Sequence, residues 1–242
     1  MTRARGLPWV LLAAALLSAL FAALGTWQVQ RLGWKKALIA RTEARVGAAP
    51  VAPPALRAWP AIQAAPLEFE YRRLRLQGEF LHADEALVQA STALGAGFWV
   101  LTPLRLPDGS IVLVNRGFVP PERRDPAQRG AAAPAGTATV VGLLRITEPG
   151  GGFLRENDPA ADRWHSRDVA AIAAARGLPA DRVAPYFVDA EGTPAGQWPV
   201  GGLTVLRFTD NHLVYAVTWY ALALMVAAAG WFVLRTARRP PD

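Results

Sequence analysis

The sequence contains no cysteine, and that absence excludes several kinds of chemistry. A chain without thiols can hold no disulfide, zinc–thiolate site or iron–sulfur cluster, and it has no thiol redox couple. Methionine is scarce as well: the 242 residues include two, whereas a Cu(I) chaperone needs several soft sulfur ligands. The composition therefore disfavours a function in copper delivery.

Motifs for catalysis are also missing. There is no G-x-S-x-G elbow, and the three histidines have no partner at the spacing of a nucleophile and its base. The glycines at 150–152 lack the lysine and the following helix that a phosphate-binding loop requires. We therefore predict that the protein is not an enzyme. The alternative is a membrane-anchored envelope enzyme, which hydrolytic turnover by the isolated domain would support.

Basic residues outnumber acidic ones, with 26 Lys and Arg against 19 Asp and Glu, for a formal net charge of +7. They are spread along the chain and form no basic stripe of the kind that binds nucleic acid, so nucleic acid is not an expected partner. Part of the excess follows the last apolar segment, at Arg235, Arg238 and Arg239. Membrane lipid is the expected partner of these side chains.

Two long apolar segments predict transmembrane helices. Leu7 to Gly25 carries no charge over 19 residues, and Leu213 to Leu234 carries none over 22. At 1.5 Å per residue, each is long enough to cross a hydrocarbon core of about 30 Å. The alternative for the first segment is a cleaved signal peptide, because Ala23-Leu24-Gly25 resembles a small-residue cleavage site. The length of the apolar segment favours an uncleaved anchor.

The charges next to the two segments predict their orientation. Short basic ends, with Arg3 and Arg5 at one terminus and Arg235 at the other, place both termini in the cytoplasm. The basic residues from Arg31 to Arg45 oppose this assignment by count, but long loops translocate largely regardless of charge. Six residues before the first span are too few for a mitochondrial presequence, so we expect a bacterial cell inner membrane.

The predicted fold class is a membrane protein of α+β type, with two transmembrane helices flanking one β-rich extracytoplasmic domain. From Thr26 to Arg45 the pattern predicts a helix near the headgroups, and the prolines between Ala48 and Pro66 predict a semi-rigid linker. The expected segments are a cytoplasmic N-terminus (1–6), a first span (7–25), a juxtamembrane helix and Pro-rich linker (26–66), the domain (67–211), a second span (212–234) and a cytoplasmic tail (235–242).

Alternating apolar residues predict mostly antiparallel strands in the domain. The first is a long strand from Leu67 to Phe80 with a bulge. One soluble helix is predicted as well, capped by Ser166, with Asp168 in its first turn and its end at Gly177. The remaining predicted strands are Ala86–Gln89, Phe98–Leu106, Ile111–Val119, Thr139–Ile146, Tyr186–Asp189 and Thr204–Phe208.

His212 is the most informative single residue, because it stands immediately before the second apolar segment. Helical spacing places His212, Tyr215, Ala216 and Trp219 on one face, so an imidazole and two aromatic rings line one stripe at the membrane boundary. Such a stripe suits an amphipathic porphyrin, with the imidazole as an axial ligand of haem iron. The alternative is a set of ordinary interfacial aromatics, with His212 serving to cap the helix through Asn211.

The other polar candidates have structural explanations. His82 follows a predicted strand and is expected at the surface, while His165 is expected to form a hydrogen bond at the start of the soluble helix. Asn115-Arg116-Gly117 interrupts an apolar strand. That tripeptide is either a bulge or partner-facing turn, or an anion or propionate site, and the residues alone leave both open.

A set of segments in chain order covers nearly the whole sequence. The segments are Leu24–Arg31 with Trp34 and Lys35, Glu70–Arg72 with Gly78 and Phe80, Val112–Pro120, Asn157 with Trp164–Asp168, and Asn211–Leu213 with Tyr215, Thr218, Trp219 and Tyr220. Together they resemble the SURF1 family. One such segment alone would be weak evidence, whereas their order and the two-span layout make the resemblance specific.

The resemblance implies a part in cytochrome c oxidase biogenesis, at the step where haem a enters the catalytic subunit. Some bacterial members are regarded as haem a binders, and the histidine proposed as their iron ligand corresponds to His212. Tyr215, Trp219 and Trp27 are weaker candidates for the porphyrin wall. The implied partners are cytochrome c oxidase subunit I and haem a synthase. The alternative is a scaffold that holds the nascent subunit without binding cofactor.

Overall fold

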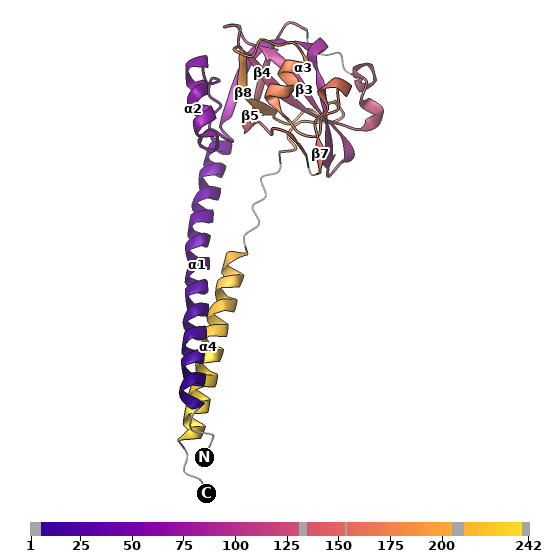
Figure 1. Cartoon of the computed structure of the whole chain (residues 1–242). Helices are drawn as coiled ribbons and strands as arrows, with labels where there is room; N and C mark the ends of the chain where they lie inside the picture. The colour runs from indigo at the N-terminus through magenta and orange to yellow at the C-terminus, as the bar shows by residue number, and fades with distance from the viewer. Residues whose placement is uncertain (1–5, 131–134, 153, 205–210, 239–242) are drawn as a thin grey trace. The chain divides into compact units, whose positions relative to one another are not determined.

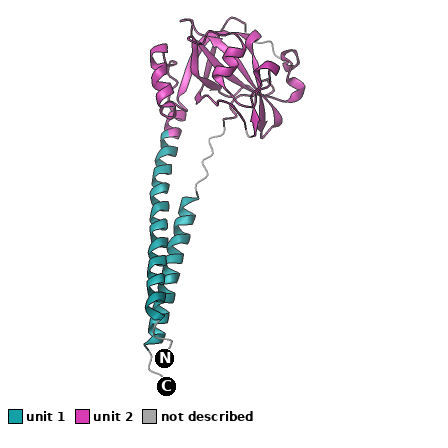
Figure 2. Cartoon of the chain, viewed as in Figure 1, with its two compact units in different colours: residues 1–41, 206–242 teal, residues 42–205 magenta. Residues whose placement is uncertain are grey.

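The computed structural model describes residues 6–130, 135–152, 154–204 and 211–238. These residues form two compact units, which are coloured separately in Figure 2. We call residues 1–41 with 206–242 the helix pair, and residues 42–205 the β domain. Each unit is described by itself.

The helix pair consists of α4 (His212–Ala237) and of α1 (Leu7–Gly47) up to Arg41, and the two helices lie side by side in Figure 1. Both are long and apolar enough to cross a membrane, judged by length and composition. The predicted spans 7–25 and 212–234 therefore fall within real helices. The helix expected from Thr26 to Arg45 is confirmed as a direct continuation of the first apolar segment, because α1 runs without a break for 41 residues.

Small residues allow the two helices to approach closely. A Cβ added to Gly25 would lie 2.9 Å from the Tyr220 ring, so only glycine leaves room for this contact. Polar bonds accompany it: the Ser18 hydroxyl donates to the Ala223 carbonyl at 2.9 Å, and the Thr26 and Tyr220 hydroxyls are 3.0 Å apart. The apolar segments of α1 and α4 are therefore joined by specific contacts.

The β domain is built on one six-stranded sheet with the order β1-β5-β8-β4-β3-β2. β1 also pairs with β3, through Glu79 opposite Arg105, so the sheet closes into a barrel. β4 and β8 are parallel and every other pair in this sheet is antiparallel. The strands are β1 (Arg73–Phe80), β2 (Ala86–Thr92), β3 (Gly95–Arg105), β4 (Ile111–Val119), β5 (Thr137–Ile146) and β8 (Val183–Ala190), with a small ladder of β6 (Gly151–Gly152) and β7 (Arg155–Glu156).

Alternating residues place two apolar clusters on opposite faces of this sheet. Leu74, Leu76 and Val112 face one cluster, whereas Leu113, one residue further along β4, faces the other. The short helix α2 (Trp59–Ala64) covers the first cluster and α3 (Val169–Ala175) covers the second. Single 3₁₀ turns complete the domain at Leu56–Ala58, Pro66–Glu68, His82–Asp84, Pro121–Arg123, Pro126–Arg129 and Pro159–Ala161.

The strand predictions are confirmed for most of the sheet. The strand expected at Ile111–Val119 has those bounds as β4, and four others occur as β2, β3, β5 and β8 with ends that coincide or differ by up to three residues. The expected strand start at Leu67 is wrong. Pro66–Glu68 is a 3₁₀ turn and Tyr71 adopts a positive φ of 62°, so the strand begins at Arg73. The strand expected at Thr204–Phe208 lies, after Thr204, outside the described residues.

Two further expectations differ from the structure. The proline-rich stretch expected to be a linker carries α2, whose Trp59 and Ile62 are buried in the core, so it belongs to the β domain. The cap of α3 is Asp168 and not Ser166, because the Asp168 carboxylate accepts from the Ala171 amide at 3.1 Å. The Ser166 hydroxyl donates elsewhere, to the Glu148 carbonyl.

Candidate functional site

His212 is the first residue of α4, and its ring is hydrogen-bonded across the helix pair. Its Nδ1 lies 2.7 Å from the Oε1 of Gln28 on α1. An amide oxygen only accepts, so Nδ1 is the donor in this bond, and in a neutral imidazole Nε2 then carries the lone pair. Asn211 occupies the N-cap position without a side-chain capping bond. The arrangement sets the tautomer of His212 and orients its ring.

The aromatic residues predicted beside His212 lie on both helices. Trp219 packs against Phe21 of α1 with ring centroids 5.6 Å apart. Tyr215 is 54% exposed and Trp27 is 50% exposed, and the Arg31 guanidinium lies 5.8 Å from the Trp27 ring. His212 contacts α1 through its hydrogen bond with Gln28. A porphyrin wall formed by Tyr215, Trp219 and Trp27 therefore stays a prediction.

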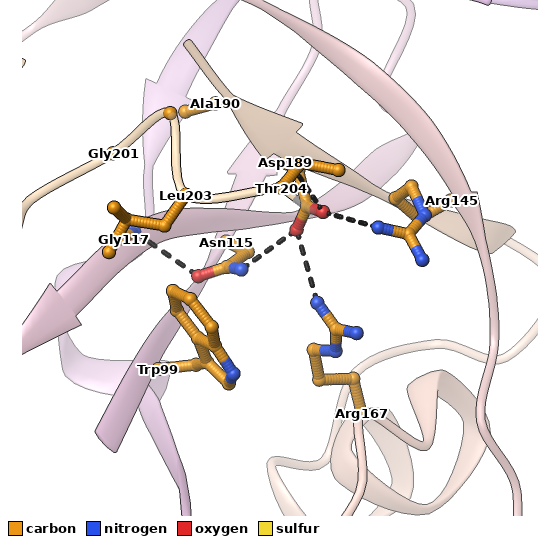
Figure 3. A pocket seen from close by; sticks show the side chains of 11 residues that line it. Trp99, Asn115, Gly117, Arg145, Arg167, Asp189, Ala190, Gly201, Leu203 and Thr204 are labelled. Carbon is orange, nitrogen blue, oxygen red and sulfur yellow. Dashed lines mark hydrogen bonds and ion pairs between the residues drawn. The ribbon is translucent and has the colours of Figure 1, made fainter. Parts of the chain in front are cut away.

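A second concentration of polar groups lies in the β domain, around the buried carboxylate of Asp189 on β8 (Figure 3). Its Oδ1 accepts from Asn115 Nδ2 at 2.8 Å and from Arg167 Nη1 at 3.3 Å. Its Oδ2 accepts from Arg145 Nη1 at 2.9 Å and from the Thr204 hydroxyl at 3.0 Å. Four donors thus compensate for the removal of this charge from water.

Each arginine also binds a second carboxylate. Arg145 Nε donates to Glu70 at 3.3 Å, and Arg167 Nε donates to Glu148 at 3.0 Å. The result is an alternating series of Glu70, Arg145, Asp189, Arg167 and Glu148, which we call the Asp189 network. Burial by itself would lower the pKa of Arg145, but the carboxylate of Asp189 raises the pKa above its usual value, so this guanidinium stays charged.

The segment Trp164–Asp168 folds so that Arg167 reaches Asp189. The Asn157 side-chain oxygen accepts from the backbone amides of His165 and Ser166, at 2.8 and 3.1 Å, and fixes the turn. Trp164 is buried in the second apolar cluster and anchors the segment. The hydrogen bond expected at His165 is present, but it comes from the backbone amide. His82 lies in a 3₁₀ turn beside Phe80.

The Asn115-Arg116-Gly117 motif takes its shape from a side-chain to main-chain bond. The Asn115 oxygen accepts from the Gly117 amide at 3.1 Å, and Gly117 adopts a φ of +131°. A register shift in the pairing of β3 with β4 lies opposite this tripeptide, as the bulge explanation predicts. Arg116 points towards Glu85, at 3.9 Å, which also binds Arg129 through both carboxylate oxygens.

Sequence reasoning singled out His212 as a site residue and included Arg167 and Gln28 only as members of resembling segments, whereas it did not single out Asp189 or Arg145. Gln28 lies inside the Leu24–Arg31 segment, so its place there was an available signal. Arg145 is the single charged residue of β5, and Asp189 is the single charged residue of β8. A charge in a buried strand needs a partner, and that requirement was the signal for the other two.

Among the described residues, no group of three or more His, Cys, Asp or Glu could hold a metal ion.

Comparison with known proteins agrees with these motifs. The SURF1 family model matches residues 15–224. The chain belongs to the SURF1 family. It is 36% identical over 247 residues to a SURF1-like protein of Monosiga brevicollis, covering 96% of this chain and 89% of that protein. It is 37% identical over 251 residues to Surfeit locus protein 1 of Homo sapiens, covering 93% and 76%. The resemblance inferred from the sequence is thereby confirmed.

The stability of this SURF1 family member should depend on pH through Glu148. Burial would raise the pKa of Glu148, but hydrogen bonds from Arg167 and its positive charge lower the pKa below the usual 4.5. A carboxyl with a depressed pKa stabilises the fold above pH 4.5, and this contribution is lost as the pH falls below that value. Glu148→Gln should therefore flatten the decline in urea midpoint on acidification, followed by near-ultraviolet circular dichroism.

The control for this experiment is Asp181→Asn, because the Asp181 side chain is 81% exposed and lies 3.7 Å from Arg182. We expect the urea midpoint of Asp181→Asn to decline on acidification as that of the parent protein does. An equally steep decline in Glu148→Gln and in the parent would contradict the role given to Glu148.

Proposed function

We propose that this protein is an assembly factor for cytochrome c oxidase that binds haem a at the membrane face and assists its insertion into the catalytic subunit. Membership of the SURF1 family supports the first part. In the proposal, α1 and α4 cross a bacterial inner membrane, both termini are cytoplasmic, and the β domain lies on the extracytoplasmic side. The observation that carries the haem part is the hydrogen bond between His212 and Gln28.

His212 is the residue that would hold the haem iron, and Gln28 supports it. A histidine that binds iron must be neutral, and its other ring nitrogen is usually hydrogen-bonded to an acceptor that fixes the tautomer. Gln28 supplies that acceptor, so Nε2 of His212 is the nitrogen that would bind iron. When bound, haem a would supply two things: the iron that binds His212, and an amphipathic ring. Tyr215, Trp219 and Trp27 would offer the aromatic surface.

The proposed role involves no turnover of substrate. In the proposal, His212 would hold the haem iron and Gln28 would orient the His212 ring. The proposed partners are subunit I of the oxidase, which receives the cofactor, and haem a synthase, which supplies it. The β domain would meet these proteins outside the membrane.

The test is the absorption spectrum of the detergent-purified full chain from cells that make haem a. We expect a haem spectrum in the parent and its loss in His212→Ala. Gln28→Leu should keep the ligand but weaken haem binding by about 10–100-fold, as loss of an orienting partner does at metal sites. His82→Ala is the matched control, because His82 lies in the β domain. Full haem occupancy in His212→Ala would rule out His212 as the ligand.

A scaffold that binds the nascent subunit without cofactor is the second candidate. The observation in its favour is that the motifs at Glu70, Asn115 and Arg167 meet in the Asp189 network of the β domain. In this case the purified protein should be colourless and should still capture subunit I, and His212→Ala should do so as well as the parent. Loss of capture in His212→Ala, with the fold intact, would contradict it.

A further inference from the structure

A small cavity adjoins the Asp189 network in the β domain (Figure 3). It is lined by residues of β3, β4, β5 and β8, by Arg167, which precedes α3, and by the segment from Gly201 to Thr204. Its volume is about 190 Å³, below the about 300–1,000 Å³ of sites for drug-sized ligands. The space therefore suits one functional group with a short stem, and not a whole cofactor.

The charged side chains that line the cavity are two guanidiniums and one carboxylate, those of Arg145, Arg167 and Asp189. Asp189 is saturated by its four donors, so it has little capacity to bind a further group. Glu70 and Glu148 compensate the arginines from outside the lining, and Glu148 is 39% exposed, so water screens its charge. The lining itself has a net charge of +1, but Glu70 is only 12% exposed and pairs with Arg145 from outside it. The feature that favours an anionic group is therefore the set of N–H groups that the two arginines have left, and not net charge.

Both arginines retain hydrogen-bonding capacity. A guanidinium has five N–H groups. Arg145 uses Nε for Glu70 and Nη1 for Asp189, and its Nη2 has no acceptor among the residues that the structure describes. Arg167 uses one N–H of Nη1 for Asp189 and Nε and Nη2 for Glu148. Planar guanidiniums bind carboxylates in fork geometry, so the remaining donors match such a group.

Aromatic rings hold these guanidiniums in position and add an apolar wall. The Arg167 guanidinium lies 4.7 Å from the Phe187 ring centroid and 6.0 Å from that of Trp99, and Arg145 lies 5.0 Å from the Tyr71 ring. Stacking of this kind restricts the rotamers of the arginine side chains before a ligand binds, so less conformational entropy is lost on binding. Trp99 and Leu203 line the cavity beside the charges. They suit an apolar stem of two or three carbons.

We propose that this cavity binds a carboxylate on a short apolar stem, with Arg145 and Arg167 as its donors and Trp99 against the stem. A glutamate side chain of a partner protein and a free short-chain organic acid share this chemistry. The proposal does not depend on haem binding by the helix pair, so the two can fail separately.

The experiment is a titration of the full chain in detergent micelles with sodium propionate, followed by the indole N–H resonance of Trp99. That resonance is assigned by its absence in Trp99→Phe. We expect a saturable shift with a dissociation constant of about 1–10 mM, which is reasonable for one charged group. Propionamide, which has the same shape without the charge, should cause no saturable shift. An equal response to propionamide, or none to propionate, would overturn the proposal.

A substitution of Arg145 tests the planar donor geometry of the guanidinium while keeping the positive charge. Arg145→Lys keeps a cation beside Asp189 and Glu70 but loses the planar donors, so propionate affinity should fall about tenfold, or by about 1.4 kcal/mol. Arg182→Lys is the matched control, because Arg182 is exposed and lies outside the cavity. Unchanged affinity in a folded Arg145→Lys would contradict the proposed contact.

A blocked tripeptide with one central glutamate separates the two sources of carboxylate, with its glutamine analogue as control. Tighter binding of the glutamate peptide than of propionate, with competition between them, would assign the cavity to a partner protein. Binding of propionate alone would assign it to a free acid. Binding of the glutamine peptide as tightly as the glutamate peptide would contradict carboxylate recognition.

Discussion

Replacement of Asp189 by alanine is expected to destabilise the β domain by about 3–5 kcal/mol, the cost of removing one partner from a buried ion pair. The carboxylate is 5% exposed and accepts four hydrogen bonds. Without it, Arg145 and Arg167 would each lose one of two carboxylate partners while staying largely buried. Asn115 would lose its acceptor as well, which adds the penalty of an unsatisfied polar group.

The measurement is urea unfolding of the full chain in detergent micelles, followed by near-ultraviolet circular dichroism. Asp181→Ala is the control, because its exposed ion pair with Arg182 should contribute less than about 1 kcal/mol. A change in unfolding free energy as small in Asp189→Ala as in Asp181→Ala would show that the network does not stabilise the domain.

Gly117→Ala is expected to destabilise the β domain by about 3 kcal/mol, because backbone strain and overpacking each cost about 1–3 kcal/mol. Gly117 has a φ of +131°, in a region that residues with a Cβ avoid. An added Cβ would also lie 2.3 Å from the Val200 carbonyl carbon. Main-chain bonds between Phe118 and Val200 hold those two backbones together, so neither can move away cheaply.

The same urea unfolding experiment tests this substitution. Gly192→Ala is the matched control, because no atom lies within 4 Å of its added Cβ and its φ is not positive. It should leave the unfolding free energy unchanged or raise it by up to about 1 kcal/mol, through a stiffer unfolded chain. Equal effects of the two substitutions would show that the backbone contact at Gly117 has no energetic importance.

Local patterns predicted the regular elements well, because the period of apolar residues is a local property. The two long helices and most strands of the sheet are examples, and β4 agrees to the residue. The predictions failed where tertiary contacts override the pattern. Leu67, Phe69 and Tyr71 alternate with polar residues as in a strand. Pro66 nevertheless starts a 3₁₀ turn, and the Tyr71 amide donates a hydrogen bond to the Leu144 carbonyl, which fixes the backbone at the end of this segment.

Prolines misled the prediction for a similar reason. They indicated a linker between Ala48 and Pro66, but Trp59 and Ile62 have a core to pack against, and burial of two large apolar side chains stabilises a short helix there. Ser166 and Asp168 are both capable caps in sequence. Only the position of the Glu148 carbonyl, which accepts from Ser166, leaves Asp168 as the residue that caps α3.

The sequence by itself determined the absence of thiol chemistry, the two apolar segments, the order of the motifs and, through them, the family. These properties depend on composition and on neighbours along the chain. Tertiary structure decided the closure of the sheet, the partner of His212 and the convergence of Arg145, Arg167 and Asn115 on Asp189. Gln28 and His212 are 184 residues apart, and Asn115 and Asp189 are 74 apart. Contacts over such separations depend on how the helices and strands pack in three dimensions. Hydrophobic periodicity specifies which face of an element is buried, but not which side chain packs against that face.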